Sequence, residues 1–156
     1  MTRKIATFAA GCFWGVEASF KKLPGVIDTV VGYTGGEVEK PTYRMVCSDK
    51  TGHAEAVQIT YDPDRIEYKD LVKKFFDLHN PTTPNRQGPD VGSQYRSVIF
   101  YNDEEQHKIA EETKNELDQS EKYSYPIVTQ IIPAEDFYEA EEYHQDYYAK
   151  NKSWRS

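Results

Sequence analysis

A cysteine beside two large aromatic residues stands where a predicted strand gives way to a predicted helix. Residues 11–15 read Gly-Cys-Phe-Trp-Gly, after an apolar stretch over residues 4–10 and before apolar residues at helical spacing. Cys12 is therefore expected in the first turn of the helix, where unpaired N–H groups and the helix dipole favour a thiolate. The flanking glycines let the chain turn tightly and leave the sulfur uncovered. The pattern predicts a reactive cysteine with a pKa below the free value of about 8.5.

The same five residues also fit a purely structural interpretation. Free cysteine is among the most buried residue types, and large aromatic side chains commonly fill protein cores. An inert Cys12 packed between Phe13 and Trp14 therefore remains an alternative on local sequence alone.

The second side chain that could do chemistry is Glu55, on a predicted strand over residues 54–61. Alternation along the strand places Glu55 on the face of three apolar residues, so the carboxylate ends an apolar row. Burial there would raise its pKa and keep a fraction protonated near neutral pH, as a general acid requires. A glutamate that turns to water at a frayed strand end is the alternative. His53 shares the face, but no ligand cluster completes a set, so no metal site is predicted.

The elements that must position these side chains alternate along the chain. Strands are also predicted over residues 26–33, 97–101 and 127–132, and helices over residues 68–79 and 102–120, the latter capped by Asn102. Residues 81–96 contain three prolines and two glycines, which predicts a long loop of the kind that often carries function. After Pro133 a last helix is expected, with Phe137, Ala140, His144 and Tyr147 on one face. His79 and His144 are interpreted as core or capping histidines.

Length and composition predict one α+β domain over residues 1–156, with helices packed on a sheet. No apolar run approaches the roughly 20 residues of a membrane span, and the first residues lack a signal peptide pattern, so we expect a cytoplasmic protein. The two cysteines then indicate thiols rather than a disulfide framework. A net charge of −7 argues against nucleic acid and anionic membranes as partners.

Six segments together resemble the A-type peptide methionine sulfoxide reductases, and the resemblance covers residues 4–150. The segments are Gly11-Cys12-Phe13-Trp14-Gly15, Val-Gly-Tyr-Thr-Gly-Gly at 31–36, Thr42-Tyr43, Thr-Gly-His-Ala-Glu-Ala-Val at 51–57, Asp-Val-Gly-Ser-Gln-Tyr-Arg-Ser at 90–97, and Ala-Glu-Glu-Tyr-His-Gln at 140–145. The resemblance implies a two-layer sandwich, a ferredoxin-like plait with helices on a mixed sheet. It also implies reduction of the S epimer of methionine sulfoxide, free or in proteins, without a cofactor.

The resemblance also assigns roles to residues. Cys12 would attack the sulfoxide sulfur as a thiolate and become a sulfenic acid, while Glu55 would protonate the oxygen. The aromatic rings of Phe13 and Trp14 would wall an apolar pocket for the substrate methyl group. Tyr43 and Tyr95 would supply further hydrogen-bond donors.

Asp90 would be a polar member of the same site that orients groups rather than exchanging protons. The family is expected to have asparagine before this aspartate, whereas this chain has Pro89. Because proline fixes φ and lacks an N–H group, the departure puts the placement of Asp90 in question.

The recycling step is where the chain departs further from the family. Many members carry resolving cysteines in a glycine-rich C-terminal tail, whereas residues 151–156 contain none. A sulfenic acid at Cys12 must condense with another thiol before reduction can finish. We expect a small thiol or a thioredoxin-like protein to attack it directly. The alternative is a disulfide with Cys47, which lies four residues after Tyr43 on a predicted helical turn.

Two other classes of function remain on the sequence alone. A cysteine hydrolase could pair Cys12 with His53 or His144, because a thiolate–imidazole pair activates the nucleophile. A peptide-binding domain without catalysis could use the same aromatic pocket.

Overall fold

The computed structural model describes residues 3–48 and 51–147. The cysteine-free segment 151–156, on which the expected recycling route depends, lies outside the described residues. Within the described ranges, no helix has both the length and the apolar character needed to cross a membrane.

Four antiparallel strands form the centre of the sheet in the spatial order β6-β1-β3-β2. They are β1 (Lys4–Ala10), β2 (Val26–Thr34), β3 (Ala54–Tyr61) and β6 (Ser97–Tyr101). Helix α1 (Phe13–Lys21) connects β1 to β2, and α3 (Tyr68–Asp77) connects β3 to β6. This β-α-β-β-α-β arrangement is the predicted ferredoxin-like plait.

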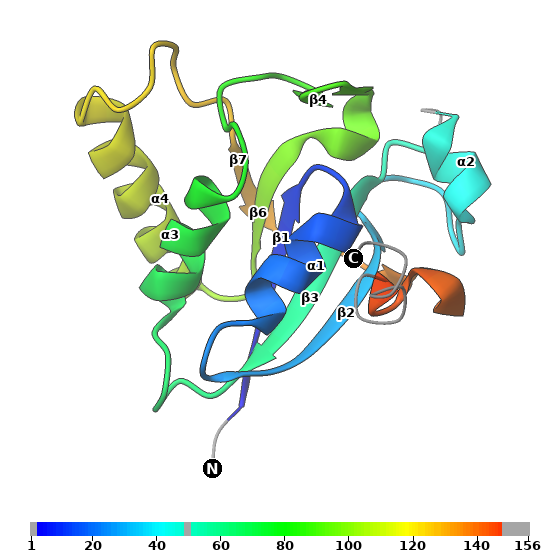
Figure 1. Cartoon of the computed structure of the whole chain (residues 1–156), viewed down its shortest axis with the longest axis horizontal. Helices are drawn as coiled ribbons and strands as arrows, with labels where there is room; N and C mark the ends of the chain where they lie inside the picture. Colours follow the sequence, from blue (N-terminus) through cyan, green and yellow to red (C-terminus); the bar gives the residue numbers. More distant parts are fainter. Residues whose placement is uncertain (1–2, 49–50, 148–156) are drawn as a thin grey trace, which may run out of the picture.

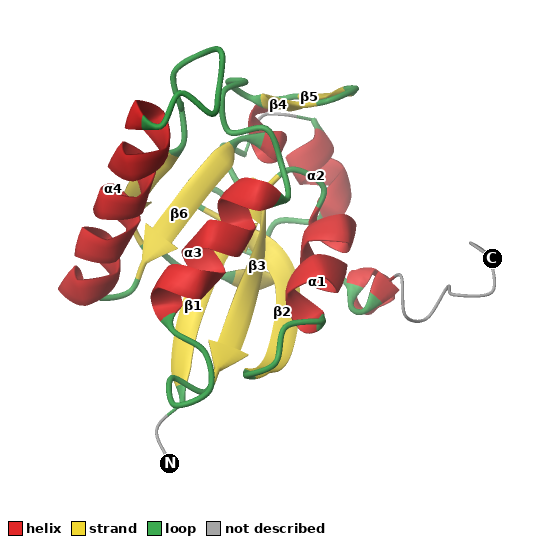
Figure 2. Ribbon diagram, turned by 60° about the vertical axis from the view of Figure 1, so that its left-hand side comes forward, coloured by secondary structure: helices red, strands yellow, loops and turns green. Residues whose placement is uncertain are grey.

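Two further strands extend the sheet at its edges. Strand β7 (Gln130–Pro133) pairs in parallel with β6, and β8 (Tyr138–Glu139) pairs antiparallel with β2, so the six-stranded sheet is mixed, as predicted. Helix α4 (Glu104–Gln119) lies beside α3, and Figure 2 shows α1, α3 and α4 on one side of the strands. The short elements are α2 (Tyr43–Cys47), β4 (Arg86–Gln87), β5 (Asp90–Val91), and the 3₁₀ helices η1 (Ser93–Tyr95) and η2 (Glu142–His144).

The main core lies between the sheet and the helices. Phe8 of β1 stacks on Phe20 of α1 at 5.2 Å and on Phe75 of α3 at 5.3 Å between ring centroids. Along β3, alternation directs Val57 and Ile59 into this core, while Ala54 and Ala56 join a smaller cluster on the opposite face. Glu55 has the parity of Val57, so its carboxyl lies on the helical side of the sheet.

The C-terminal segment is not the predicted helix. Residues 135–147 contain β8 and η2 in place of one continuous helix. The Ala140 N–H donates to the Val31 carbonyl at 2.9 Å, and the Gln145 amide bonds both the N–H and the C=O of Val31. The segment therefore satisfies its polar groups against strand β2, which its helical spacing could not reveal.

Two element boundaries also differ from the predictions. Helix α4 is capped by Asp103, whose carboxylate accepts from the Gln106 N–H at 2.8 Å, while Asn102 lies one residue earlier and bonds the Gln106 side chain. Strand β7 begins three residues later than the predicted 127–132 strand, because the Val128 N–H bonds to the Pro81 carbonyl instead.

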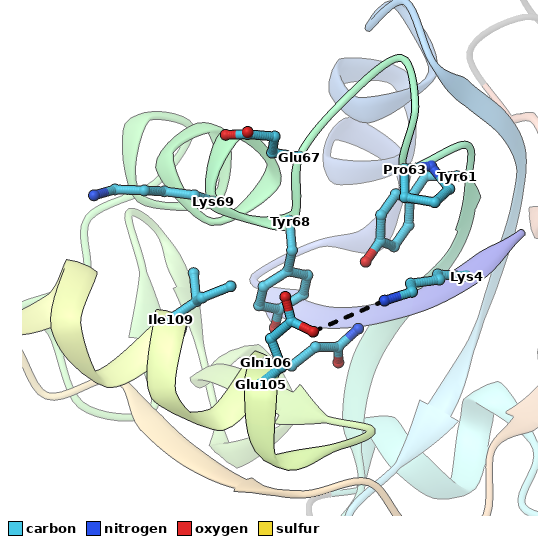
Figure 3. Close-up of a pocket in the computed structure, with 9 residues that line it drawn as sticks. All are labelled: Lys4, Tyr61, Pro63, Glu67, Tyr68, Lys69, Glu105, Gln106 and Ile109. Carbon is cyan, nitrogen blue, oxygen red and sulfur yellow. Dashed lines mark ion pairs between the residues drawn. The ribbon is translucent and has the colours of Figure 1, made fainter. Parts of the chain in front are cut away.

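A crevice lies between the first turns of α3 and α4, at the end of the sheet where β1 begins (Figure 3). Lys4, Tyr61, Tyr68 and Gln106 are among its lining residues, and Lys4 forms an ion pair with Glu105 across it. None of the side chains predicted to do chemistry lines this crevice. The candidate active site is at the opposite end of β1.

Candidate active site

Cys12 is the N-cap residue of α1, at the end of the sheet where Figure 1 also shows α2 and β4. Its carbonyl accepts the Val16 N–H at 3.5 Å, and its side chain makes no capping hydrogen bond, although the backbone N–H groups of Trp14 and Gly15 lie near enough to the sulfur to lower the pKa of the thiol. Gly11 enters this turn at φ +98°, a backbone conformation that favours glycine. The predicted location of the cysteine at the helix N-terminus is confirmed.

The predicted pKa of Cys12 is wrong in sign. The pKa of the Cys12 thiol is raised to about 11. Its partial burial is the largest cause, and the charges of Glu55 and Asp90 act in the same direction. The N–H groups of Trp14 and Gly15 oppose this shift, but they do not outweigh desolvation. The resting group at neutral pH is therefore a thiol.

Glu55 is buried, as its place in the strand pattern predicted, with 1% of its surface exposed. Its Oε1 accepts the Phe13 N–H at 3.3 Å, which ties the carboxyl to the residue after Cys12. Burial raises its pKa to about 8, opposed by the Phe13 N–H and assisted by the charge of Asp90. Glu55 is therefore mostly protonated at neutral pH, and the water-exposed alternative is wrong.

The second oxygen of Glu55 has no hydrogen-bond partner among the described residues. Oε2 is buried, and no hydrogen-bonding group within residues 3–48 and 51–147 reaches it. A buried polar atom left unpaired costs free energy, so such atoms mark places where a water or ligand completes the site. On a protonated carboxyl, this free position can donate a hydrogen bond to an incoming oxygen atom.

Two phenols face the same region. Burial, then a hydrogen bond to the Cys47 thiol, raises the pKa of Tyr43 far above its ordinary value. Burial, followed by the charge of Glu55, raises the pKa of Tyr95 to about 12. Both hydroxyls keep their protons at neutral pH and can act as donors. The charge of Asp90 affects Cys12, Glu55 and Tyr95 alike, so this carboxylate lies within electrostatic range of all three despite Pro89.

The two aromatic residues after Cys12 differ in exposure. Phe13 is 1% exposed and packs against the rings of Tyr33, Tyr43 and His144. Trp14 is half-buried, and its Nε1–H donates to Nδ1 of His144 at 2.9 Å. Of the two, Trp14 therefore offers the more accessible apolar surface.

The sequence pattern did not anticipate the residues that hold this aromatic pair. Tyr147 stacks on Trp14 with a centroid distance of 3.8 Å and an interplanar angle of 8°. Glu141 accepts from the Tyr33 hydroxyl at 2.8 Å and from the Tyr43 N–H at 3.0 Å. His144 is buried, as predicted, and it also contacts Trp14. These contacts join positions about 100 or more residues apart, which local periodicity cannot show.

The other polar candidates have structural partners. Nδ1 of His53 accepts the Gly36 N–H at 3.0 Å, and its Nε2 lies 2.6 Å from the Val38 carbonyl, so both ring nitrogens bind backbone. His79 is half-buried, and its ring nitrogens lie 2.6 Å from the Phe75 carbonyl and 2.7 Å from the Ser97 hydroxyl, which fits its interpretation as a core or capping histidine. Cys47 is exposed at the end of α2 and, like Cys12, is a free thiol. Among the described residues, no group of three potential metal ligands gathers.

These features define a class of site. A cysteine caps a helix beside an accessible indole, and a buried protonated carboxyl and two phenols supply donors in the same region. The arrangement can bind an apolar group next to the sulfur while donating hydrogen bonds to a neighbouring oxygen. Such an arrangement suits an enzyme that uses a cysteine sulfur against a polar, oxygen-bearing group.

Comparison with known proteins places the chain in a family. The family model described as peptide methionine sulfoxide reductase matches residues 4–156. A curated relative, peptide methionine sulfoxide reductase MsrA of Methanoculleus marisnigri, is 60% identical over 145 residues, covering 93% of this chain and 88% of the relative. The chain belongs to the peptide methionine sulfoxide reductase family, as its motifs predicted.

Solved structures agree with this assignment. The crystal structure of Mxr1 from Saccharomyces cerevisiae in reduced form is 40% identical, with a TM-score of 0.90 over 96% of this chain and 86% of that chain. A structure of Mxr1 in complex with Trx2 is 31% identical, with a TM-score of 0.67 over 93% of this chain and 84% of that chain.

The electrostatic coupling in this site predicts how Glu55→Gln changes Cys12. Because the ionised carboxylate opposes the thiolate, the neutral amide should lower the pKa of the Cys12 thiol. The rate of iodoacetamide alkylation, measured against pH in a Cys47→Ser background, should rise at lower pH in Glu55→Gln. The difference should be largest above about pH 8, where Glu55 is ionised. Identical pH profiles for the two proteins would show that the groups are not coupled.

Proposed function

We propose that this chain reduces the S epimer of methionine sulfoxide, free or in proteins, to methionine at the expense of a thiol. Its family membership supports the reaction, and the unpartnered Oε2 of the buried Glu55 carboxyl is the observation that carries the assignment of the site. Residues 1–156 act as a single catalytic domain in the cytoplasm.

Substrate binding follows from the two kinds of surface in the site. The substrate methyl group lies in an apolar pocket walled by Phe13 and Trp14, and the sulfoxide oxygen accepts hydrogen bonds from Glu55, Tyr43 and Tyr95. Sulfoxide sulfur is a weak electrophile until its oxygen is hydrogen-bonded or protonated. The donors therefore act most strongly on the developing charge of the transition state.

The chemical step keeps its protons within the site. The Cys12 sulfur attacks the sulfoxide sulfur as its own proton leaves, and the Glu55 carboxyl donates its proton to the oxygen. The oxygen then passes to the Cys12 sulfur, the bonds that join the substrate sulfur to the oxygen and to the Cys12 sulfur both break, and methionine departs with its sulfur reduced by two electrons. Cys12 becomes a sulfenic acid, and the proton lost from its thiol restores the Glu55 carboxyl. Asp90 orients the donors through its charge.

Recycling requires a thiol from outside the site. A thiol condenses with the Cys12 sulfenic acid to give a mixed disulfide and water, and a second thiol releases Cys12 as the free thiol. The Mxr1 structure with Trx2 supports a thioredoxin-like protein as the donor, and a small thiol is chemically equivalent. Cys47 is the alternative resolving group within the chain.

The proposed reaction predicts stereospecific turnover that depends on Cys12. With dithiothreitol as reductant, the wild type should reduce the S epimer of methionine sulfoxide and leave the R epimer unchanged. Cys12→Ser should lose measurable activity, because its hydroxyl is a much weaker nucleophile than the thiol. Chiral chromatography of the remaining sulfoxide measures both outcomes. Absence of turnover of either epimer by the wild type would reject the proposal, and an acyl-enzyme without consumption of reductant would favour a cysteine hydrolase.

The proposed recycling route predicts the mass of the oxidised protein. After reaction with excess sulfoxide and no reductant, intact-mass measurement should show the gain of one oxygen atom, located at Cys12 by peptide mapping. Cys47→Ser is the matched control and should give the same product. Loss of two hydrogen atoms in the wild type, with a peptide linking Cys12 to Cys47, would contradict direct attack by an external thiol.

A further inference from the structure

Glu17 is a buried carboxylate without a role in the chemistry above. It lies on α1, three residues after Trp14, and only 2% of its surface is exposed. Its Oε2 accepts the Thr29 hydroxyl of β2 at 2.8 Å, and its Oε1 accepts the Asp146 N–H at 2.8 Å. Both oxygens therefore have partners, and the second one lies 129 residues further along the chain.

Asp146 stands between the two residues that hold Trp14. His144 accepts the Trp14 indole N–H, and Tyr147 stacks on the indole ring. Asp146 has φ 52°, a left-handed conformation that aspartate adopts more readily than most residues but that still costs free energy. The bond from its N–H to Glu17 and the surface ion pair of its carboxylate with Lys21 stabilise this turn.

We propose that Glu17 is a positioning residue for the substrate pocket, and that it acts through the turn at Asp146 to hold the Trp14 ring in place. The contacts form a closed path. Helix α1 carries both Trp14 and Glu17, Glu17 binds Asp146, and the neighbours of Asp146, His144 and Tyr147, contact Trp14. That Trp14 lines a substrate pocket rests on the proposed function, whereas the path from Glu17 to Trp14 consists of contacts within the chain.

Two substitutions of Glu17 distinguish a role as a hydrogen-bonding anchor from a role in filling the core. A methionine side chain would fill similar space but leave the Asp146 N–H without an acceptor, which is costly when the group is buried. A glutamine could keep both bonds, because its carbonyl accepts the Asp146 N–H while its amide donates to the Thr29 hydroxyl. Glu17→Met and Glu17→Gln therefore form a matched pair.

The test compares kinetics and the environment of Trp14 in these variants. Glu17→Met should raise KM for the S epimer by about tenfold with little change in kcat, because the loss of one anchoring hydrogen bond loosens the binding surface. Glu17→Gln should keep KM within about twofold of the wild type. Acrylamide quenching of Trp14 emission, measured in a Trp154→Phe background, should be faster in Glu17→Met only.

Thr29→Val is a second control. It removes the other hydrogen bond of Glu17, so it should lower the melting temperature without changing KM or quenching of Trp14. A Glu17→Met protein with wild-type KM and wild-type quenching overturns the inference, even if its melting temperature falls. An equal rise of KM in Thr29→Val would also overturn it, because the effect would then be one of general stability.

The experiment also separates this inference from the proposed function. If the wild type does not reduce methionine sulfoxide, the proposed function fails, and the quenching comparison alone decides the role of Glu17. If Glu17→Met does not fold, hydrogen exchange of the Asp146 amide in the wild type tests whether Glu17 anchors this turn. Slow exchange of that amide supports the anchor, and exchange as fast as that of an exposed amide overturns it.

Discussion

The candidate active site depends on the Glu55 carboxyl group, which is buried and has one oxygen without a hydrogen-bond partner among the described residues. Glu55 lies under the first turn of α1, where the Phe13 N–H binds one of its oxygens. Burial keeps the group protonated near neutral pH, with a pKa of about 8. The other oxygen is left for a partner that the described part of the chain does not provide. The surrounding structure keeps this oxygen buried and places the Cys12 sulfur within electrostatic range of the Glu55 carboxyl.

The ferredoxin-like plait brings the parts together at one end of the sheet. Cys12 follows the end of β1 and lies at the N-terminus of α1, and Glu55 lies near the start of β3 on the helical side of the sheet. The connection between β2 and β3 contributes Tyr43, and the segment before β6 contributes Tyr95. The C-terminal segment pairs with β2 through β8 and then contacts Trp14 through His144 and Tyr147. The candidate site therefore gathers groups from five separate stretches of sequence.

The sequence predicted the parts of this site that local pattern controls. Strand alternation placed Glu55 in the core, and the strand-to-helix junction placed Cys12 at a helix N-terminus. The pKa of Cys12 depended on tertiary burial and on two carboxylates from other elements, so a local argument predicted the wrong sign. The predicted C-terminal helix failed for a related reason. Its apolar spacing was real, but Gln145 binds the backbone of β2, and no local pattern identifies that partner.

In the proposed reaction the reactive state holds two protons, one on Glu55 and one on the Cys12 thiol. The most direct measurement is the single-turnover rate of sulfenic acid formation from pH about 6 to about 10, in the wild type and in Glu55→Gln. The wild-type rate should fall as pH rises through about 8, where the carboxyl loses its proton. Glu55→Gln should be slower by about a hundredfold and should lack this fall. A wild-type rate that instead climbs through this range toward the Cys12 pKa, with the same profile in Glu55→Gln, would contradict the account.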